Sequence, residues 1–363
     1  MIGTRGIPAR AGGAERVVEE LTRELTARGH EVIVYGRRGY LPSRPVSPAG
    51  HVLLTPGLSG KHLDAATHTF TAMCDVLRRG VDVVHLHSPG PALWSWLPRL
   101  TGLPLVLTVH APDWRRAKWS PPARAAIALG LRCGMRFASA VTAVSAPLAD
   151  ELSRRFAREV VCVPNAVRPP RPAPPRRIVQ WGLRPGRYVL YVGRIEPEKR
   201  LDVLLRAWGE LQPEGGELVV AGDVETGAYG RRCRRDAPPG VRFLGPRFGR
   251  TLDELYANAA LVVHPSELEG MSLVLLEAAA YGRCVVAADI PANRAVLGDD
   301  AVYWSGSPSE LAGQIRRCLQ GETWRDTIGR RAQRRVARRF AWGAVASAME
   351  GIYARLLRGG KMR

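Results

Sequence analysis

The chain has 363 residues, 46% of them hydrophobic and 24% charged, a composition typical of globular proteins. This length exceeds one ordinary hydrophobic core and predicts two domains. No apolar run reaches the ~18 residues that a membrane-spanning helix needs, and the N-terminus has no apolar segment of the signal-peptide type. Six cysteines are scattered singly, which disfavours zinc and disulfide frameworks and favours a reducing cytoplasm: Cys74, Cys133, Cys162, Cys233, Cys284 and Cys318.

The formal net charge of +20 has two interpretations, which the sequence leaves open. Attraction to an anionic partner, such as lipid head groups, nucleic acid or phosphorylated ligands, would explain it. A compositional bias would explain it equally well, because arginine, proline, alanine and glycine are all abundant, as in proteins of GC-rich genomes. Local clusters of charge are therefore more informative than the total.

Strands and helices alternate in the first half of the chain. Gly3 to Pro8 resembles a strand-to-helix loop although only Met1 and Ile2 precede it, so either the true start lies upstream or the first strand is a stub. Strands are predicted at 31–35, 52–55, 81–85, 105–109, 140–144 and 160–163, and helices at 14–28, 64–79, 122–137 and 147–156.

A stretch rich in proline and arginine, residues 168–187, comes next and predicts a semi-rigid linker, because its prolines exclude a continuous helix. Beyond it, strands are predicted at 188–192, 218–221, 241–244, 260–264, 285–287 and 301–303, and helices at 200–209, 252–257 and 271–281, with only helices after Tyr303. We therefore expect an α/β protein with two facing, doubly wound parallel-sheet domains, 1–167 and 188–341. Ligands of such folds bind at the carboxyl ends of strands, which here predicts the cleft between the domains.

Residues 264–277, HPSELEGMSLVLLE, carry the strongest functional signal. Glu269 lies in a loop and Glu277 about two helical turns later, roughly 12 Å away at ~1.5 Å per residue. Gly270 permits close approach of a ligand, and the N–H groups of Met271 to Leu273 would face an anion at the helix N-terminus. This arrangement predicts a nucleotide-diphosphate sugar, with one carboxylate for each sugar and amide dipoles for the diphosphate.

Three other loops carry candidate ligands. Arg194 and Lys199 lie between a strand and a helix, where cations oppose the helix dipole unless an anion compensates, so we expect them to bind a diphosphate. Gly12 and Gly13 precede the first long helix and permit close approach of a ligand, although two glycines alone indicate only a turn. His110 follows a strand and is either structural or a ligand of the donor sugar.

Other histidines and basic segments have plainer interpretations. His85 and His87 also lie at a strand end, and we expect them to be structural or to support the site. Residues 113–137 interleave tryptophan with arginine and lysine, which suits an anionic membrane surface or, equally, an ordinary surface helix. The basic run 330–339 predicts a solvated helix face.

Some motifs are absent. The sequence contains no P-loop, no Asp-x-Asp, no cluster at metal-ligand spacing and no G-x-S-x-G nucleophile elbow. We therefore expect no metal and no cofactor, and neutralisation of the diphosphate by Arg194, Lys199 and amide dipoles.

Together these elements resemble the family 4 glycosyltransferases, whose GT-B fold has two Rossmann-like domains. The resemblance rests on Glu269-x7-Glu277, Gly193-Arg194 followed by Lys199, the Gly12-Gly13 loop and the Pro164-Asn165 turn, and it spans nearly the whole chain. The opening GTRGIPARAGGAERVVEEL, the segment HAPDWRRAKW and residues 269–299 look like a bacterial subgroup described as rhamnosyl- or other hexosyltransferases of surface polysaccharides.

The resemblance implies a role for each candidate. Arg194 and Lys199 would bind the donor diphosphate, Glu277 the ribose and Glu269 the donor hexose, with His110 beside the reacting carbon. The backbone of Gly270, Met271, Ser272 and Leu273 would contact sugar and phosphate, and Gly12-Gly13 would approach from the other domain. The reaction would retain the anomeric configuration without a metal, with developing charge on the leaving diphosphate to be stabilised. A C-terminal helix within 342–363 would pack back on the first domain.

The sequence departs from the family pattern at three places. Ala166 replaces the glycine usual after the Pro-Asn turn, and Ala111 replaces a frequent glycine after the histidine. Met271-Ser272 stands where many members have Phe-Gly, next to the sugar-facing Glu269. The short first strand leaves the placement of Gly12-Gly13 open.

Three further functions remain as alternatives. These are glycosylation of a soluble natural product instead of a surface polysaccharide or glycolipid, nucleotide-sugar 2-epimerisation on the same architecture, and nucleic-acid binding. We expect no nucleic-acid partner, because no recognised module is present and the charge is dispersed. The expected partners are a nucleotide-sugar donor, a sugar, lipid-linked or small-molecule acceptor, and an anionic membrane surface on the inner face of the plasma membrane.

Overall fold

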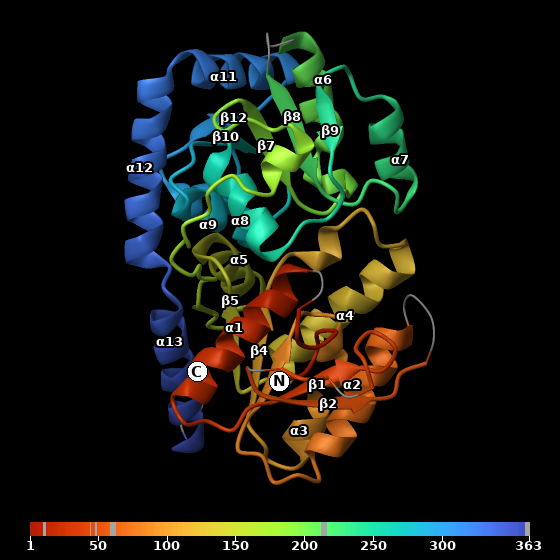
Figure 1. The fold of residues 1–363 in the computed structure, drawn as a ribbon. Helices are drawn as coiled ribbons and strands as arrows, with labels where there is room; N and C mark the ends of the chain where they lie inside the picture. Colours follow the sequence, from red (N-terminus) through yellow and green to blue (C-terminus); the bar gives the residue numbers. More distant parts are fainter. Residues whose placement is uncertain (10–11, 44, 48, 59–62, 212–215, 360–363) are drawn as a thin grey trace. The chain divides into compact units, whose positions relative to one another are not determined.

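The computed structural model describes residues 1–9, 12–43, 45–47, 49–58, 63–211 and 216–359, so Arg10 and Ala11 of the opening segment lie outside it. The chain divides into two compact units, Met1–Ala166 with Trp342–Arg363 and Val167–Ala341 (Figure 1). Residues 168–187 belong to the second unit and include the short 3-10 helix η3, Ile178–Trp181. None of the helices in these described ranges is both long and apolar enough to cross a membrane.

The first unit contains parallel strands throughout. A two-stranded sheet pairs β1 with β2, and a four-stranded sheet has the order β3-β4-β5-β6. The strands are β1 Ile33–Arg37, β2 His51–Thr55, β3 Val84–His87, β4 Leu105–Val109, β5 Ala140–Ala143 and β6 Val161–Cys162. Fully buried, mainly apolar runs such as β4 are typical of parallel sheets that are covered on both faces.

Met1 and Ile2 join these two sheets. Ile2 forms a parallel bridge with Leu86, through its N–H to the oxygen of His85 at 2.9 Å and its carbonyl to the N–H of His87 at 2.8 Å. On the other side, the N–H of Tyr35 donates to the oxygen of Met1 at 2.9 Å. The first two residues therefore occupy a strand position between β1 and β3, and the loop Gly3 to Pro8 follows directly.

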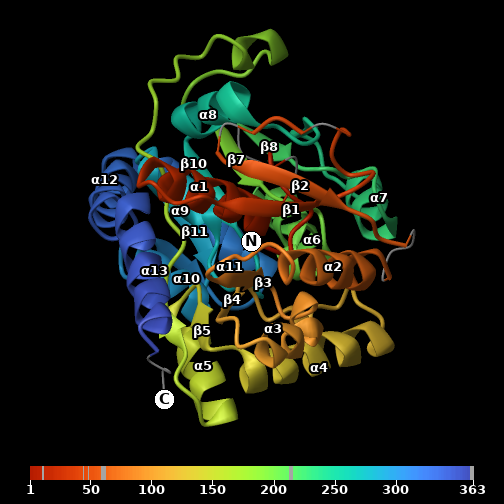
Figure 2. The same ribbon diagram turned by 90° about the horizontal axis from the view of Figure 1, so that it is seen from below.

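The helices of the first unit are α1 Gly13–Ala27, α2 Leu63–Val76, α3 Trp96–Leu100, α4 Pro121–Phe137, α5 Ala146–Phe156 and α13 Trp342–Leu357, with 3-10 turns η1 Pro91–Trp94 and η2 Asp113–Arg115. Figures 1 and 2 show α13 alongside α1. Arg28 fixes this pairing by donating to Glu350 at 2.6 Å and to the oxygen of Gly343 at 2.7 Å. The C-terminal helix thus packs within the first unit.

The second unit has one six-stranded parallel sheet in the order β12-β11-β10-β7-β8-β9. Its strands are β7 Tyr188–Val192, β8 Glu217–Ala221, β9 Val241–Phe243, β10 Leu261–His264, β11 Val285–Ala288 and β12 Val302–Trp304. The chain runs outward from β7 through β8 to β9 and then returns to the other side of β7 with β10. The strand order therefore reverses between β7 and β10, which is where ligands bind in open α/β sheets.

Helices cover this second sheet. They are α6 Leu201–Leu211, α7 Ala228–Arg235, α8 Gly249–Asn258, α9 Leu273–Ala280, α10 Pro291–Leu297, α11 Pro308–Gln320 and α12 Glu322–Arg339, with the 3-10 turn η4 Pro197–Lys199. One core cluster contains Leu204 and Trp208 of α6 together with Leu218, Val263 and Val286 of three strands. The α/β fold class predicted from the sequence is confirmed.

Candidate functional site

The loops that follow β7 and β10 form the core of the candidate site, because they begin at the point where the strand order reverses. Leu261 and Val262 of β10 pair with Val189 and Leu190 of β7, so both loops start from neighbouring, fixed strands. The loops are also joined to each other beyond the sheet. The N–H of Glu267 donates to the oxygen of Glu198 at 3.0 Å.

Glu269 is buried between two hydrogen-bond donors. Lys199 Nζ lies 2.5 Å from Glu269 Oε1, and His264 Nε2 lies 2.9 Å from the same oxygen. Only 7% of the Glu269 side chain and 3% of the His264 side chain are exposed. Burial raises the pKa of Glu269, but the Lys199 charge and the His264 hydrogen bond outweigh it and hold that pKa well below its usual range. The carboxylate is therefore ionised at every physiological pH.

Arg194 is the exposed cation of the β7 loop. Its side chain is 46% exposed, with Nη1 3.1 Å from Glu196 Oε1. Gly193 before it has φ +153°, a conformation that side chains disfavour, and the hydroxyl of Tyr191 donates to the Arg194 oxygen at 3.3 Å. Arg194 and Lys199, predicted to act together on a diphosphate, thus each form an ion pair with a glutamate.

Helix α9 begins two residues later than the sequence predicted. Ser272 is its N-cap in an extended conformation and Leu273 its first residue, in line with the preference of serine for this position. Ser272 makes no side-chain capping bond, so the unpaired N–H groups are those of the turn that starts at Leu273. Gly270 and Met271 are buried before it, and Glu277 lies half-buried on the helix.

Gly12 and Gly13 form the start of α1 in the first unit. Gly12 is the N-cap at φ +105°, and Gly13 is the first helical residue. A Cβ on Gly12 would collide with the carboxylate of Glu15. The backbone angle therefore favours glycine at position 12 independently of any ligand, whereas the Glu15 carboxylate, at the end of a flexible side chain, could move aside.

His110 directly follows β4 and contacts a buried row of histidines. His87 Nδ1 lies 3.0 Å from His110 Nε2, and the His85 and His87 rings stack with centroids 4.1 Å apart. His85 in turn bonds Thr108 Oγ1 at 2.7 Å and the hydroxyl of Tyr353 at 2.6 Å. Burial lowers the pKa of His110 to about 4, so this ring is neutral at neutral pH.

Two contacts to the candidate residues were not predicted. His264 lies in the motif 264–277, whose spacing predicts no role for it. The feature that could have identified it is a polar residue at the end of the buried strand β10. His87 was expected to be structural or to support the site, and its signal is a polar residue at the carboxyl end of β3, the strand that pairs with β4 before His110. The first contact is local, between residues five positions apart, whereas the second joins residues 23 positions apart that spacing along the chain cannot pair.

The segment 113–137 divides into paired and exposed charges. Arg115 bonds Glu151 at 2.7 Å and Arg116 lies 2.8 Å from Asp113, so these two arginines belong to local ion pairs. Helix α4 exposes three further arginines and Leu129, which is 49% exposed: Arg124, Arg132 and Arg136. Its outward face is therefore cationic with an apolar residue among the charges.

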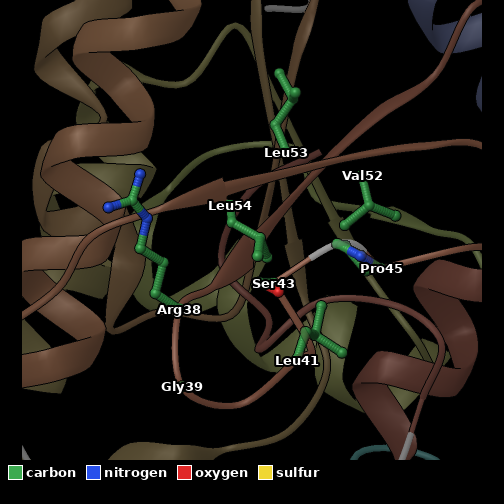
Figure 3. A pocket seen from close by; sticks show the side chains of 8 residues that line it. All are labelled: Arg38, Gly39, Leu41, Ser43, Pro45, Val52, Leu53 and Leu54. Atoms are coloured by element: carbon green, nitrogen blue, oxygen red, sulfur yellow. The ribbon is translucent and has the colours of Figure 1, made fainter.

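A surface pocket of about 750 Å³ lies in the first unit beside β2 (Figure 3). It is lined by Arg38, Gly39, Leu41, Ser43, Pro45, Val52, Leu53 and Leu54. None of the candidate residues lines it. Within the described ranges, no group of three or more histidine, cysteine or acidic residues has the arrangement of a metal site.

The sequence matches two family models. A model described as Glycosyltransferase Family 4 matches residues 11–171, and one described as Glycosyl transferases group 1 matches residues 186–321. The D-inositol 3-phosphate glycosyltransferase of Kineococcus radiotolerans is 30% identical, over 95% of this chain and 91% of its own. D-inositol 3-phosphate glycosyltransferase 2 of Catenulispora acidiphila is 31% identical, over 95% of this chain and 90% of its own.

Solved structures share the fold at lower identity. Sucrose-phosphate synthase from Thermosynechococcus elongatus superimposes with a TM-score of 0.81 at 22% identity, over 96% of this chain and 95% of that one. HepE from Anabaena, in complex with UDP-glucose, superimposes with a TM-score of 0.78 at 18% identity, over 95% of this chain and 96% of that one. At these identities the likeness concerns the fold.

Proposed function

The chain belongs to the family 4 glycosyltransferases of the GT-B fold, and from this membership we propose that it transfers a hexosyl group from a nucleotide-diphosphate sugar with retention of configuration. The observation that carries the proposal is the pair of joined loops after β7 and β10, where the strand order reverses. They bring an exposed arginine, an ionised carboxylate and the start of a helix into one part of the second unit. The structural neighbour in complex with UDP-glucose supports a UDP-sugar as the first donor to test.

In this proposal Arg194 and the N-terminus of α9 bind the diphosphate. The guanidinium of Arg194 is exposed and suits bidentate contact with phosphate oxygens. Lys199 is held by the buried Glu269 at 2.5 Å, whereas the pair of Arg194 with Glu196 is more exposed, so a phosphate engages Arg194 more readily. The unpaired N–H groups at Leu273, preceded by Gly270, Met271 and Ser272, supply the remaining donors without a metal or a cofactor.

The two glutamates take different roles. Glu277 on α9 binds the ribose hydroxyls, and the buried Glu269 binds a hydroxyl of the donor hexose. The acceptor attacks on the face from which the diphosphate leaves, so that the new C1–O bond forms as the old one breaks. The leaving diphosphate accepts the acceptor's proton, and Arg194 stabilises the negative charge that develops on it.

In the first unit we assign His110 to the donor sugar and Gly12-Gly13 to close backbone approach. His110 uses Nε2 for His87, so Nδ1 is the nitrogen that we assign to a sugar hydroxyl. The ring is neutral because burial lowers its pKa to about 4, so it acts as a hydrogen-bonding group and not as a cation.

We propose an anionic, sugar-containing acceptor of cell-surface polysaccharide or glycolipid synthesis, used at the inner face of the plasma membrane. The net charge of +20 and the exposed arginines of α4 support an anionic partner. The inositol phosphate in the names of the curated relatives supports a soluble, phosphorylated polyol as the second candidate. Competition between D-inositol 3-phosphate and lipid-linked acceptors separates the two.

The test measures release of nucleoside diphosphate from UDP-, dTDP- and GDP-sugars after a thermal-shift screen with the same compounds. Arg194→Ala and Glu277→Ala should lose donor binding and transfer while the melting temperature stays near that of the wild type. Arg206→Ala is the matched control, because that exposed side chain pairs with Asp202 on its own helix. Full transfer by both site variants would overturn the proposal. An epimer formed from donor alone, detected by NMR, would favour a 2-epimerase instead.

A further inference from the structure

His264 holds one oxygen of Glu269 from a rigid support. It is the last residue of β10 and pairs with Ala287 in the sheet register, and its side chain is 3% exposed. Its Nε2 lies 2.9 Å from Glu269 Oε1. The imidazole therefore has a fixed position from which to orient a carboxylate five residues further along the loop.

The chemistry of the pair determines which atom carries the proton. An ionised carboxylate only accepts hydrogen bonds, so His264 donates its Nε2–H. The histidine is neutral, because burial lowers its pKa even against the opposing effect of Glu269. A neutral donor orients the carboxylate without adding a second positive charge beside Lys199.

The second donor to Glu269 Oε1 is Lys199, which has a flexible side chain. Lys199 Nζ also contacts Oε1, from the end of a flexible four-carbon side chain on η4. Within the described part of the chain, the hydrogen bonds of Glu269 both end on Oε1. With Oε1 held, Oε2 is the oxygen that remains for a ligand.

We propose that His264 is a positioning residue for the donor sugar: by holding Glu269 Oε1, it directs Oε2 toward a hydroxyl of the donor hexose. This inference rests on the proposed function of the same site. It also assigns distinct tasks to the two donors. Lys199 can turn toward a bound diphosphate, while His264 keeps the carboxylate in place.

The experiment compares affinities for sugar nucleotides with affinities for the parent diphosphates. Titration calorimetry uses UDP-glucose with UDP, dTDP-glucose with dTDP and GDP-mannose with GDP, on wild type, His264→Leu, His264→Asn and His264→Gln. The glutamine amide reaches the position of the imidazole Nε2, whereas the asparagine amide is one methylene too short. Glu267→Gln is the control, since it breaks the exposed ion pair to Arg200 between the same two loops and leaves Glu269 untouched.

We expect the Leu and Asn variants to bind the preferred sugar nucleotide about tenfold more weakly, the effect of losing one charge-assisted hydrogen bond. Their affinity for the parent diphosphate should be unchanged, and the Gln and Glu267→Gln variants should behave like the wild type. Equal weakening of sugar nucleotide and diphosphate, or no weakening at all, would overturn the inference. If His264→Leu does not fold, the ratio of the sugar-nucleotide affinities of His264→Asn and His264→Gln decides the test. A wild type that binds none of the compounds would overturn the proposed function itself.

Discussion

Removal of Lys199 tests the electrostatics of the site most directly. Lys199→Met leaves the Glu269 carboxylate, 7% exposed, with His264 as its remaining donor. Breaking a buried ion pair from one side costs about 3–5 kcal/mol of unfolding free energy. In a domain of 150–250 residues, 1 kcal/mol shifts the melting temperature by about 2–4 °C. We therefore expect Lys199→Met to melt roughly 6–20 °C below the wild type.

Thermal and denaturant unfolding of matched variants check this magnitude. Arg200→Met is the control, since its pair with Glu267 is 36% and 51% exposed and is worth about 0–1 kcal/mol. The double variant Lys199→Met with Glu269→Gln carries no buried charge at this place and should recover part of the loss. If Lys199→Met is as stable as Arg200→Met, the reasoning about the buried pair is refuted.

The loss of stability in Lys199→Met should depend on pH in a defined direction. The folded pKa of Glu269 is held well below its usual range, so its contribution to stability is present above the unfolded pKa of about 4.3. That contribution disappears as the pH falls through the folded pKa. Without Lys199 the folded pKa of Glu269 rises, so the difference in stability between variant and wild type should be widest at neutral pH and narrow as the pH falls from the variant's folded pKa toward that of the wild type.

Other predictions concern single groups. Arg194→Ala should change stability by less than about 0.5 kcal/mol, because the side chain is half exposed, yet abolish diphosphate-dependent thermal shift. The folded pKa of His110 is about 4, so the stability that neutral His110 contributes should be fully present above the unfolded pKa of about 6.5 and be lost as the pH falls to about 4. Denaturant unfolding at a series of pH values measures this loss. Replacement of three exposed arginines by glutamine should weaken sedimentation with phosphatidylglycerol vesicles roughly 100-fold, at about 1 kcal/mol each: Arg124, Arg132 and Arg136.

Each of these has its own control. Arg206→Ala should keep the thermal shift that Arg194→Ala loses. For the histidine, His110→Gln should flatten the pH dependence of unfolding relative to wild type, and an unchanged slope would contradict the assigned pKa. For the membrane, the double variant Arg115→Gln with Glu151→Gln should bind vesicles like the wild type, because it removes an ion pair and leaves the net charge unchanged. Equal sedimentation with neutral and anionic vesicles would remove the support for a membrane surface.

The sequence was sufficient to predict the strands of the sheets, because most buried parallel strands are continuous apolar runs. Every predicted strand is present, with boundaries shifted by up to three residues. Short helices such as α3 and α10, of five and seven residues, were not predicted because less than two turns gives no clear periodicity. The start of α9 was placed too early because Met271 is apolar and continues the helical pattern, whereas the backbone at Ser272 is extended and the helix begins at Leu273.

Side-chain pairing at the site was beyond sequence reasoning for a different reason. Lys199 and Glu269 are 70 positions apart, and only the return of β10 to the side of β7 brings their loops together. The same topology was required to join His87 to His110, 23 positions away on a neighbouring strand. Residue types and loop positions were visible in the sequence, but the partner of each charge depends on strand order.

The cations of the β7 loop differ in how easily a diphosphate can recruit them. Each meets a carboxylate: Arg194 meets Glu196, Lys199 meets Glu269 and Arg200 meets Glu267. An exposed pair is worth little and is screened by solvent, whereas a buried pair is costly to break from one side. Arg194, the most exposed of the three cations, is therefore the one that a phosphate can capture at least cost. Capture of Lys199 would leave the buried Glu269 charge without its cation, a cost that the neutral His264 does not remove, so diphosphate binding depends mainly on Arg194.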